Sequence, residues 1–257
     1  MALSGQALMQ DGEPRKRFDG PSRIYRIGAA SGRVLLFAPF VALGASFLLL
    51  LGKGTRPAML WMLRENHPVE VATFALSFAG SLAGLRLART LRERGEKLLV
   101  YGFYAVFSLG LFAIAMEEIA WGQKLLGFQT PAWLKPINRQ GETTLHNIGA
   151  LQGRSEWLRL VFGLAGIAGV LVSRRPRLAR IAAPAILLPW FLLITAHAAV
   201  DAYNDVFPIQ DWFDFTMQRT SEVVELLIAA AALLYVLLNS RRFRFGTWPE
   251  DPAGDAL

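Results

Sequence analysis

Six long apolar segments constrain this chain more than any other feature. They lie at about residues 34–52, 68–88, 98–116, 157–173, 179–200 and 223–239. A helix needs about 20 apolar residues to cross a hydrocarbon core about 30 Å thick, and each segment is close to that length. With 53% hydrophobic and only 18% charged residues, the chain is too apolar for an ordinary soluble domain. The sequence therefore predicts an all-α fold, a polytopic membrane helix bundle of about six transmembrane helices.

Basic residues indicate how such a bundle is oriented. Lys and Arg are retained in cytoplasmic loops, and here they cluster before the first segment and after the second, fourth and sixth. Six crossings place these four regions on one side, so both termini are predicted to be cytoplasmic. We expect a basic cytoplasmic tail over 1–33, a single transmembrane domain over 34–240 and a cytoplasmic tail over 241–257. The polar, basic start is unlike a cleaved signal peptide.

Cysteine content and charge exclude several classes of function. The chain has no cysteine, which excludes disulfides, thiolate metal sites and a cysteine nucleophile. Its net charge of +7 gathers in the predicted cytoplasmic regions. The charge therefore favours contact with anionic lipid at the cytoplasmic face and not nucleic-acid binding. Membrane lipid is the expected partner, with a membrane protein partner as an alternative.

Unusual polar residues collect on the opposite, outer side of the predicted bundle. Ionisable groups at membrane depth are costly and usually face a cavity, a partner or a substrate path. Glu118, His197 and Glu225 are the strongest examples, because each is embedded in apolar sequence. The full set of candidate site residues is Glu117, Glu118, Gln123, Glu142, His146, Asn147, His197, Asp201, Glu222 and Glu225.

The spacing of these residues favours paired side chains. The pairs at 142 and 146 and at 197 and 201 are four residues apart, so on a helix each pair shares one face. Glu222 and Glu225 are three apart and do the same. Each pair can direct two side chains at one ion.

Imidazole and carboxylate groups without thiolates suit a divalent metal, zinc first, with iron or manganese as alternatives. The predicted metal ligands are His146, His197 and Asp201, and Glu118 or Glu142 is the predicted catalytic base or an additional ligand. Water bound to such a metal loses a proton near neutral pH, and a neighbouring carboxylate can accept that proton.

Each of these features also has a structural interpretation. The sequence alone does not decide between the functional and the structural interpretation. The glutamates at 117–118 can mark the interfacial end of the third span. The pair at 142 and 146 fits the first turn of a surface helix capped by Asn147. The pair at 197 and 201 fits a hydrogen-bonded pair between spans.

Prolines, glycines and loop acids give three further expectations. Pro184 and Pro189 interrupt the predicted span that carries His197, which indicates a kink beside that histidine. Small residues within spans are typical of close helix packing, and they are Gly80, Gly84, Gly163, Gly166 and Gly169. The acids expected to be solvated in the last outer loop are Asp205, Asp211 and Asp214.

A three-part motif carries a resemblance. The chain reads E-E-I-A-W-G-Q over Glu117–Gln123, G-F-x-T-P over Gly127–Pro131, and N-x-Q-x-E-x-x-x-H-N over Asn138–Asn147. This pattern resembles a family of uncharacterised multi-pass bacterial membrane proteins, in which serine is commoner at the position of Ala120. The resemblance implies a bacterial inner-membrane location and supplies no substrate. The three histidines are also loosely similar in site chemistry to the membrane hydrolases related to alkaline ceramidases, although the paired-histidine motif of their last helix is missing.

The leading functional hypothesis is a metal-dependent membrane enzyme, a hydrolase or transferase, that acts on a lipid or lipid-linked substrate at the outer leaflet. A second hypothesis is an ion- or proton-coupled transporter in which the same acids form a proton or cation pathway. The third is a structural or assembly subunit of a larger membrane complex, whose polar residues pair with partner helices.

Overall fold

The computed structural model describes residues 24–132, 143–144 and 155–248 of the chain, and no strand occurs in these ranges. The long helices are α2 (Ala29–Leu51), α4 (Pro68–Glu93), α5 (Leu98–Glu118), α7 (Ser155–Leu171), α8 (Leu188–Val206) and α9 (Asp211–Arg244). The shorter elements are α3 (Arg56–Met62), α6 (Gln123–Leu126) and the 3₁₀ turns η1 (Ala120–Gly122), η2 (Val172–Arg174) and η3 (Ala185–Leu187). Six described helices are long and apolar enough to cross a membrane, which confirms the all-α, six-span prediction.

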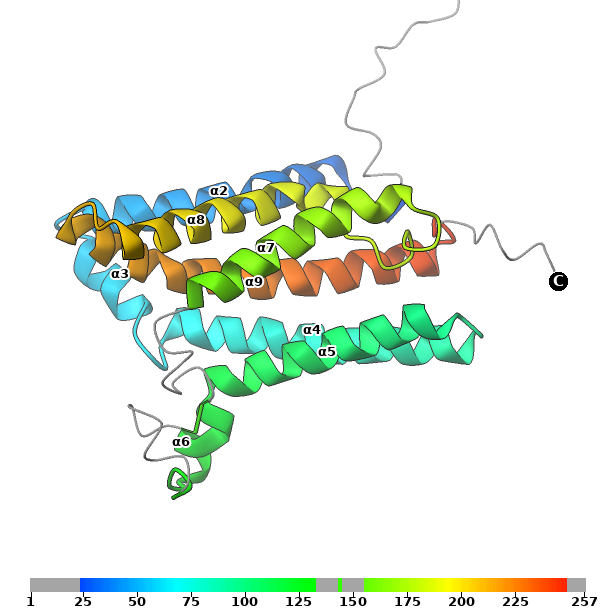
Figure 1. Ribbon diagram of the computed structural model, residues 1–257, viewed down its shortest axis with the longest axis horizontal. Helices are drawn as coiled ribbons and strands as arrows, with labels where there is room; N and C mark the ends of the chain where they lie inside the picture. The colour runs from blue at the N-terminus through cyan, green and yellow to red at the C-terminus, as the bar shows by residue number, and fades with distance from the viewer. Residues whose placement is uncertain (1–23, 133–142, 145–154, 249–257) are drawn as a thin grey trace, which may run out of the picture.

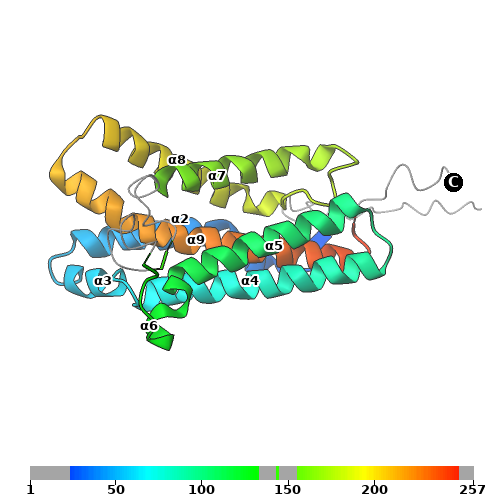
Figure 2. The same cartoon turned by 60° about the horizontal axis from the view of Figure 1, so that its bottom comes forward.

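Two helical hairpins flank the last helix (Figure 1, Figure 2). α4 packs against α5, α7 packs against α8, and α9 contacts both hairpins, while α2 packs on α8 and α9. The core therefore surrounds α9, where Val224 and Val236 are fully buried. We call the end where α5 and α8 finish and α4, α7 and α9 begin the acidic end, at the left of Figure 1. The opposite end is the basic end, and it carries exposed Arg86, Arg92, Arg94, Arg174, Arg175, Arg177, Arg241 and Arg244.

The last helix is much longer than its apolar segment. α9 begins at Asp211, three turns before the predicted 223, and runs to Arg244. The predicted outer loop therefore ends earlier than expected. Asp211 and Asp214 lie in the first turn of α9, where carboxylates are stabilised by the positive end of the helix dipole. Glu222 and Glu225 consequently lie well inside the helix and not at its start.

The two prolines start the fifth span instead of kinking it. The prediction of a kink beside His197 was wrong, because Pro184 precedes η3 and Pro189 lies in the first turn of α8. Proline is tolerated there, since the first-turn N–H groups have no helical acceptor. His197 lies about two turns further along, in regular helix.

The chain before α8 is not helical, although the fifth span was predicted to begin at 179. Ala182 and Pro184 are fully buried, and backbone at such depth must find hydrogen-bond partners inside the protein. Tyr104, Tyr235 and Asn239 donate to the successive carbonyl oxygens of residues 180–182, at 2.9, 2.8 and 3.2 Å. Side chains of α5 and α9 thus replace the missing helical hydrogen bonds.

The glycines of the spans lie where helices approach closely, as predicted. A Cβ added to Gly166 would come within 2.1 Å of the Phe191 ring, and one on Gly163 within 2.3 Å of the Thr195 hydroxyl. The other three would meet neighbouring side chains at 3.0 Å (Gly80), 2.1 Å (Gly84) and 3.1 Å (Gly169). Close contact at these positions stabilises the helix pairs by packing.

The two ends of the described chain meet at the basic end. The Thr247 hydroxyl donates to the Ile24 carbonyl at 2.7 Å, and the Arg26 guanidinium lies 4.7 Å from the centre of the Phe245 ring. Tyr25 is buried beneath Arg242, and this burial raises the pKa of the Tyr25 hydroxyl. The segment just before α2 is therefore part of the packed bundle.

Candidate functional site

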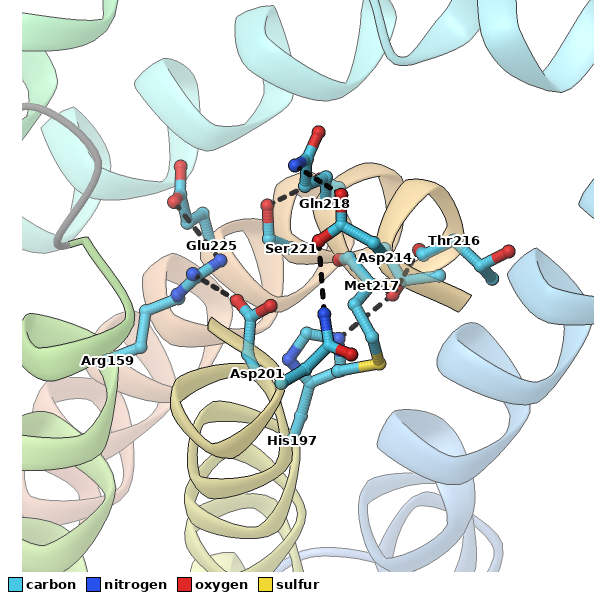
Figure 3. A network of polar contacts seen from close by, with 11 residues as sticks. Arg159, His197, Asp201, Asp214, Thr216, Met217, Gln218, Ser221 and Glu225 are labelled. Carbon is cyan, nitrogen blue, oxygen red and sulfur yellow. Dashed lines mark hydrogen bonds and ion pairs between the residues drawn. The ribbon is translucent and has the colours of Figure 1, made fainter. Parts of the chain in front are cut away.

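A buried ion pair joins α7 to α8 at the acidic end (Figure 3). Arg159 lies in the second turn of α7 and Asp201 in the second-last turn of α8, and Nη2 of the arginine is 2.7 Å from Oδ2 of the aspartate. Their side chains are only 5% and 8% exposed. An arginine fork matches a carboxylate well and tolerates partial desolvation. The pair fixes the two helices of this hairpin relative to each other.

Glu225 extends this pair to α9. Its Oε1 lies 3.7 Å from Nη1 of Arg159, and its side chain is 33% exposed. Within the described residues, Nε and Nη1 of Arg159 make no hydrogen bond. The guanidinium therefore has one close carboxylate partner and one distant partner, on two different helices.

His197 contacts α9 independently of Asp201. Its Nε2 lies 2.9 Å from the Thr220 hydroxyl, which itself donates to the Thr216 carbonyl at 2.9 Å. When the Thr220 hydrogen points to that carbonyl, Nε2 of His197 donates to the hydroxyl and Nδ1 carries the lone pair. His197 is 6% exposed, and its Nδ1 has no hydrogen-bond partner among the described residues.

Four glutamates from three helices lie close enough to influence one another, and two of them, Glu222 and Glu225, also interact with Arg159. Glu118 at the end of α5 interacts electrostatically with Glu70 at the start of α4 and with Glu222 and Glu225 of α9. Glu222 in turn interacts with Arg159. All four glutamates are half-buried. We call Glu70, Glu118, Glu222 and Glu225 the glutamate cluster.

Asn204 organises the turn that follows Asp201. This fully buried residue donates from Nδ2 to Asp214 at 3.0 Å and accepts the N–H of Ile209 at 3.1 Å. Asp214 also accepts from Gln218 at 3.0 Å and is half-buried, so it is less solvated than predicted. Asp205 and Asp211 are exposed, as expected. Asn204 thus fixes the α8–α9 turn beside the ion pair.

The motif segment after α5 forms a compact turn. Trp121 Nε1 donates to Glu117 Oε1 at 2.7 Å. Gln123 donates to the Thr130 hydroxyl at 3.1 Å and accepts the N–H of Thr143 at 2.6 Å. Gln123 therefore links all three parts of the motif, which is a structural role.

Left-handed backbone follows the glutamate pair. Ala120 and Trp121 have φ of 46° and 54°, and Gly122 has φ of 79°. A left-handed conformation costs a non-glycine residue about 1–2 kcal/mol, so the surrounding contacts must hold this turn. It directs the chain away from α5 toward α6, at the lower left of Figure 1.

The predicted metal ligands do not converge within the described residues. Glu142, His146 and Asn147 lie outside those ranges. Asp201 is paired with Arg159, and His197 contacts Thr220. In the described ranges, no group of three or more His, Asp or Glu residues is placed to hold a metal ion. A metal site that includes His146 stays a prediction.

Arg159 is the residue that sequence reasoning missed. It stands in SEWLRLVF, two residues inside the predicted fourth span, and an arginine in an apolar span is a signal for a functional or paired group. Asn204 and Thr220 were also missed. Single uncharged polar residues in a helix are common, so nothing in the sequence marked these two as functional.

The comparisons with known proteins give no relative. No protein-family model, curated protein or solved structure matches the chain.

Proposed function

We propose that this protein conducts protons across a membrane, and that the glutamate cluster with the Arg159–Asp201 pair is its proton-exchange site. One observation carries this proposal. Half-buried and buried ionisable groups from five helices meet at the acidic end, and they comprise four glutamates, one aspartate and one arginine. Chains of such residues inside a membrane bundle are typical of proton relays in pumps and transporters.

The pairing of Asp201 supports a proton site over a metal site. Arg159 already neutralises the Asp201 carboxylate through Oδ2, at 2.7 Å. A metal bound at the other carboxylate oxygen would place a second positive charge beside the buried guanidinium, which is costly. Protonation of half-buried Glu225, which lies 3.7 Å from Nη1 of Arg159, adds no second cation.

Proton flux in proteoliposomes tests this function. Purified protein is reconstituted with a pH-sensitive dye inside the vesicles, and a potassium diffusion potential set by valinomycin drives proton entry. Glu118→Gln is expected to abolish the flux, because it removes a proton carrier from the glutamate cluster. The control is Glu93→Gln, which alters an exposed acid paired with Arg89 at the basic end. Equal flux in wild type and Glu118→Gln, or no flux above empty vesicles, would refute the function.

The unpartnered Nδ1 of His197 favours a second candidate function. A neutral imidazole with a free lone pair is a common ligand for zinc, and for iron or manganese. If His146 approaches it, the two support a metal-dependent enzyme acting on a membrane lipid. Elemental mass spectrometry of the purified protein beside His197→Ala and His146→Ala tests this candidate. Stoichiometric metal that both substitutions remove supports the enzyme, and metal-free protein after supplementation excludes it.

Membrane sidedness belongs to the same proposal. The basic end would face the cytoplasm of a bacterial cell and contact anionic lipid, and the acidic end would face outward. Because the chain has no cysteine, single cysteines report sidedness without background. Exposed Ser173 and exposed Gln129 mark the basic and acidic ends. An impermeant maleimide added to intact cells should label Gln129→Cys and spare Ser173→Cys.

A further inference from the structure

Three hydroxyl side chains lie along one face of α4, beginning one turn after Glu70. Thr73, Ser77 and Ser81 are four residues apart, so they lie one above the other, and they are only 3%, 0% and 1% exposed. The helix that carries them packs against both α5 and α9. A column of hydroxyls thus leads from the glutamate cluster into the interior of the bundle.

Two of these hydroxyls are unpaired. Thr73 donates to the Val69 carbonyl at 3.0 Å, which is the usual arrangement for a hydroxyl inside a helix. Ser77 and Ser81 have no hydrogen-bond partner among the described residues. An unpaired buried hydroxyl costs about 1–3 kcal/mol, and ordered water is the usual group that satisfies it. The two serines therefore point to bound water in this column.

The column continues on α5. A Cβ on Gly84 would lie 2.1 Å from the Ser108 hydroxyl, so Ser108 reaches the backbone of α4 one turn beyond Ser81. Ser108 donates to the Tyr104 carbonyl at 2.6 Å. The Tyr104 ring stacks on Tyr235 of α9, with 5.8 Å between ring centres.

The column ends at the basic end of the bundle. The hydroxyls of Tyr104 and Tyr235 donate to the neighbouring carbonyls of residues 180 and 181. The side chain of Arg180 is ion-paired with Glu96, and both are partly exposed. From Glu222 to Asn239 the rise along α9 is about 26 Å at 1.5 Å per residue, which approaches a hydrocarbon thickness of about 30 Å.

We propose that a water-bridged proton route crosses the α4–α5–α9 interface from the glutamate cluster to the basic end, through Thr73, Ser77, Ser81, Ser108, Tyr104 and Glu96. Each hydroxyl or water oxygen accepts a proton on a lone pair and releases its own proton to the next carrier, and Thr73, Ser108 and Tyr104 rotate their O–H groups away from their carbonyl acceptors to do so. One proton enters at the glutamate cluster, one leaves at Glu96, and the side chains return to their starting state. This proposal rests on the proposed proton conduction and specifies the residues along which the protons move.

Serine-to-alanine substitution separates the route from simple packing. Ser77→Ala and Ser81→Ala, alone and combined, remove only an oxygen and keep the small side chains that close helix packing needs. The matched control is Ser46→Ala in α2, a buried serine off the route whose hydroxyl donates to the Ala42 carbonyl at 2.7 Å. Proton flux is measured in the same proteoliposomes, with thermal unfolding as the check on folding.

The expected result is a flux at least about tenfold lower in the double variant, a tenfold change corresponding to about 1.4 kcal/mol in the barrier. Ser46→Ala should keep wild-type flux. If the double variant fails to fold, the flux through the single variants and through Tyr104→Phe tests the route instead. Wild-type flux in Ser77→Ala, Ser81→Ala and Tyr104→Phe, together with loss of flux in Glu118→Gln, overturns the route and leaves the function standing. Absence of flux in wild type overturns both.

Discussion

The buried ion pair offers the sharpest energetic prediction. Removing one partner of a buried pair leaves the other charge uncompensated and typically costs about 3–5 kcal/mol. Arg159→Met should approach the upper value, because Asp201 and Glu225 would both lose their cation. Asp201→Ala should lie near the lower value, since Glu225 remains 3.7 Å from Nη1 of Arg159. The double variant should cost about 5 kcal/mol, no more than Arg159→Met alone, because removing Asp201 adds little once Arg159 is gone.

The assay is equilibrium unfolding in mixed detergent micelles, followed by circular dichroism, for wild type, the two single variants and the double variant. The two substitutions should be strongly non-additive, with a coupling energy near about 3 kcal/mol, the upper end for residues in contact. Arg89→Met and Glu93→Ala form the control cycle. That pair is 82% and 59% exposed and should show no measurable coupling. If the Arg159 and Asp201 effects add to within about 0.5 kcal/mol, the pair is not an energetic unit.

Three further predictions concern packing and buried hydrogen bonds. Gly166→Ala should lower the unfolding free energy by about 1–3 kcal/mol, as overpacking against Phe191 typically does, whereas Gly110→Ala, with no neighbour within 4 Å, should not lower it. Asn239→Ala should cost about 1–3 kcal/mol, because it leaves the buried Ala182 carbonyl without its donor; an unchanged midpoint in the same detergent titration would contradict this. Gln123→Ala should increase trypsin cleavage between Gln123 and Thr143 at unchanged global stability, and equal cleavage rates would show that Gln123 does not hold the motif together.

The sequence predicted the six spans because the length of an apolar helix is a local property. Hydropathy alone identified all six described helices that are long and apolar enough to cross a membrane, and five of the six predicted segments overlap most of the helix that forms. The start of α9 was the largest error. The sequence of its first three turns, DWFDFTMQRTS, is polar enough to suggest a loop. In the structure these residues are helical, although they precede the apolar segment.

The side-chain partners were harder to predict. Arg159 and Asp201 are 42 residues apart, and His197 and Thr220 are 23 apart. Which residues meet depends on how each helix is rotated about its axis, and that rotation is set by packing over the whole interface. The i,i+4 spacing correctly placed His197 and Asp201 on a common stretch of helix. It did not reveal that each would contact a different neighbouring helix.

The contact between the two ends of the described chain also bears on the order of folding. Ile24 and Thr247 are separated by 223 residues, so the segment before α2 reaches its final environment only after α9 has been synthesised and inserted. Long-range contacts of this kind form late, because the loop they close is long. During synthesis the earlier hairpin of α4 and α5 can pack locally. Tyr25 can contact the Arg242 guanidinium only after α9 has been synthesised. A chain that stops within α9 would therefore leave the first span without its final neighbour, which identifies the basic end as the last part of the bundle to close.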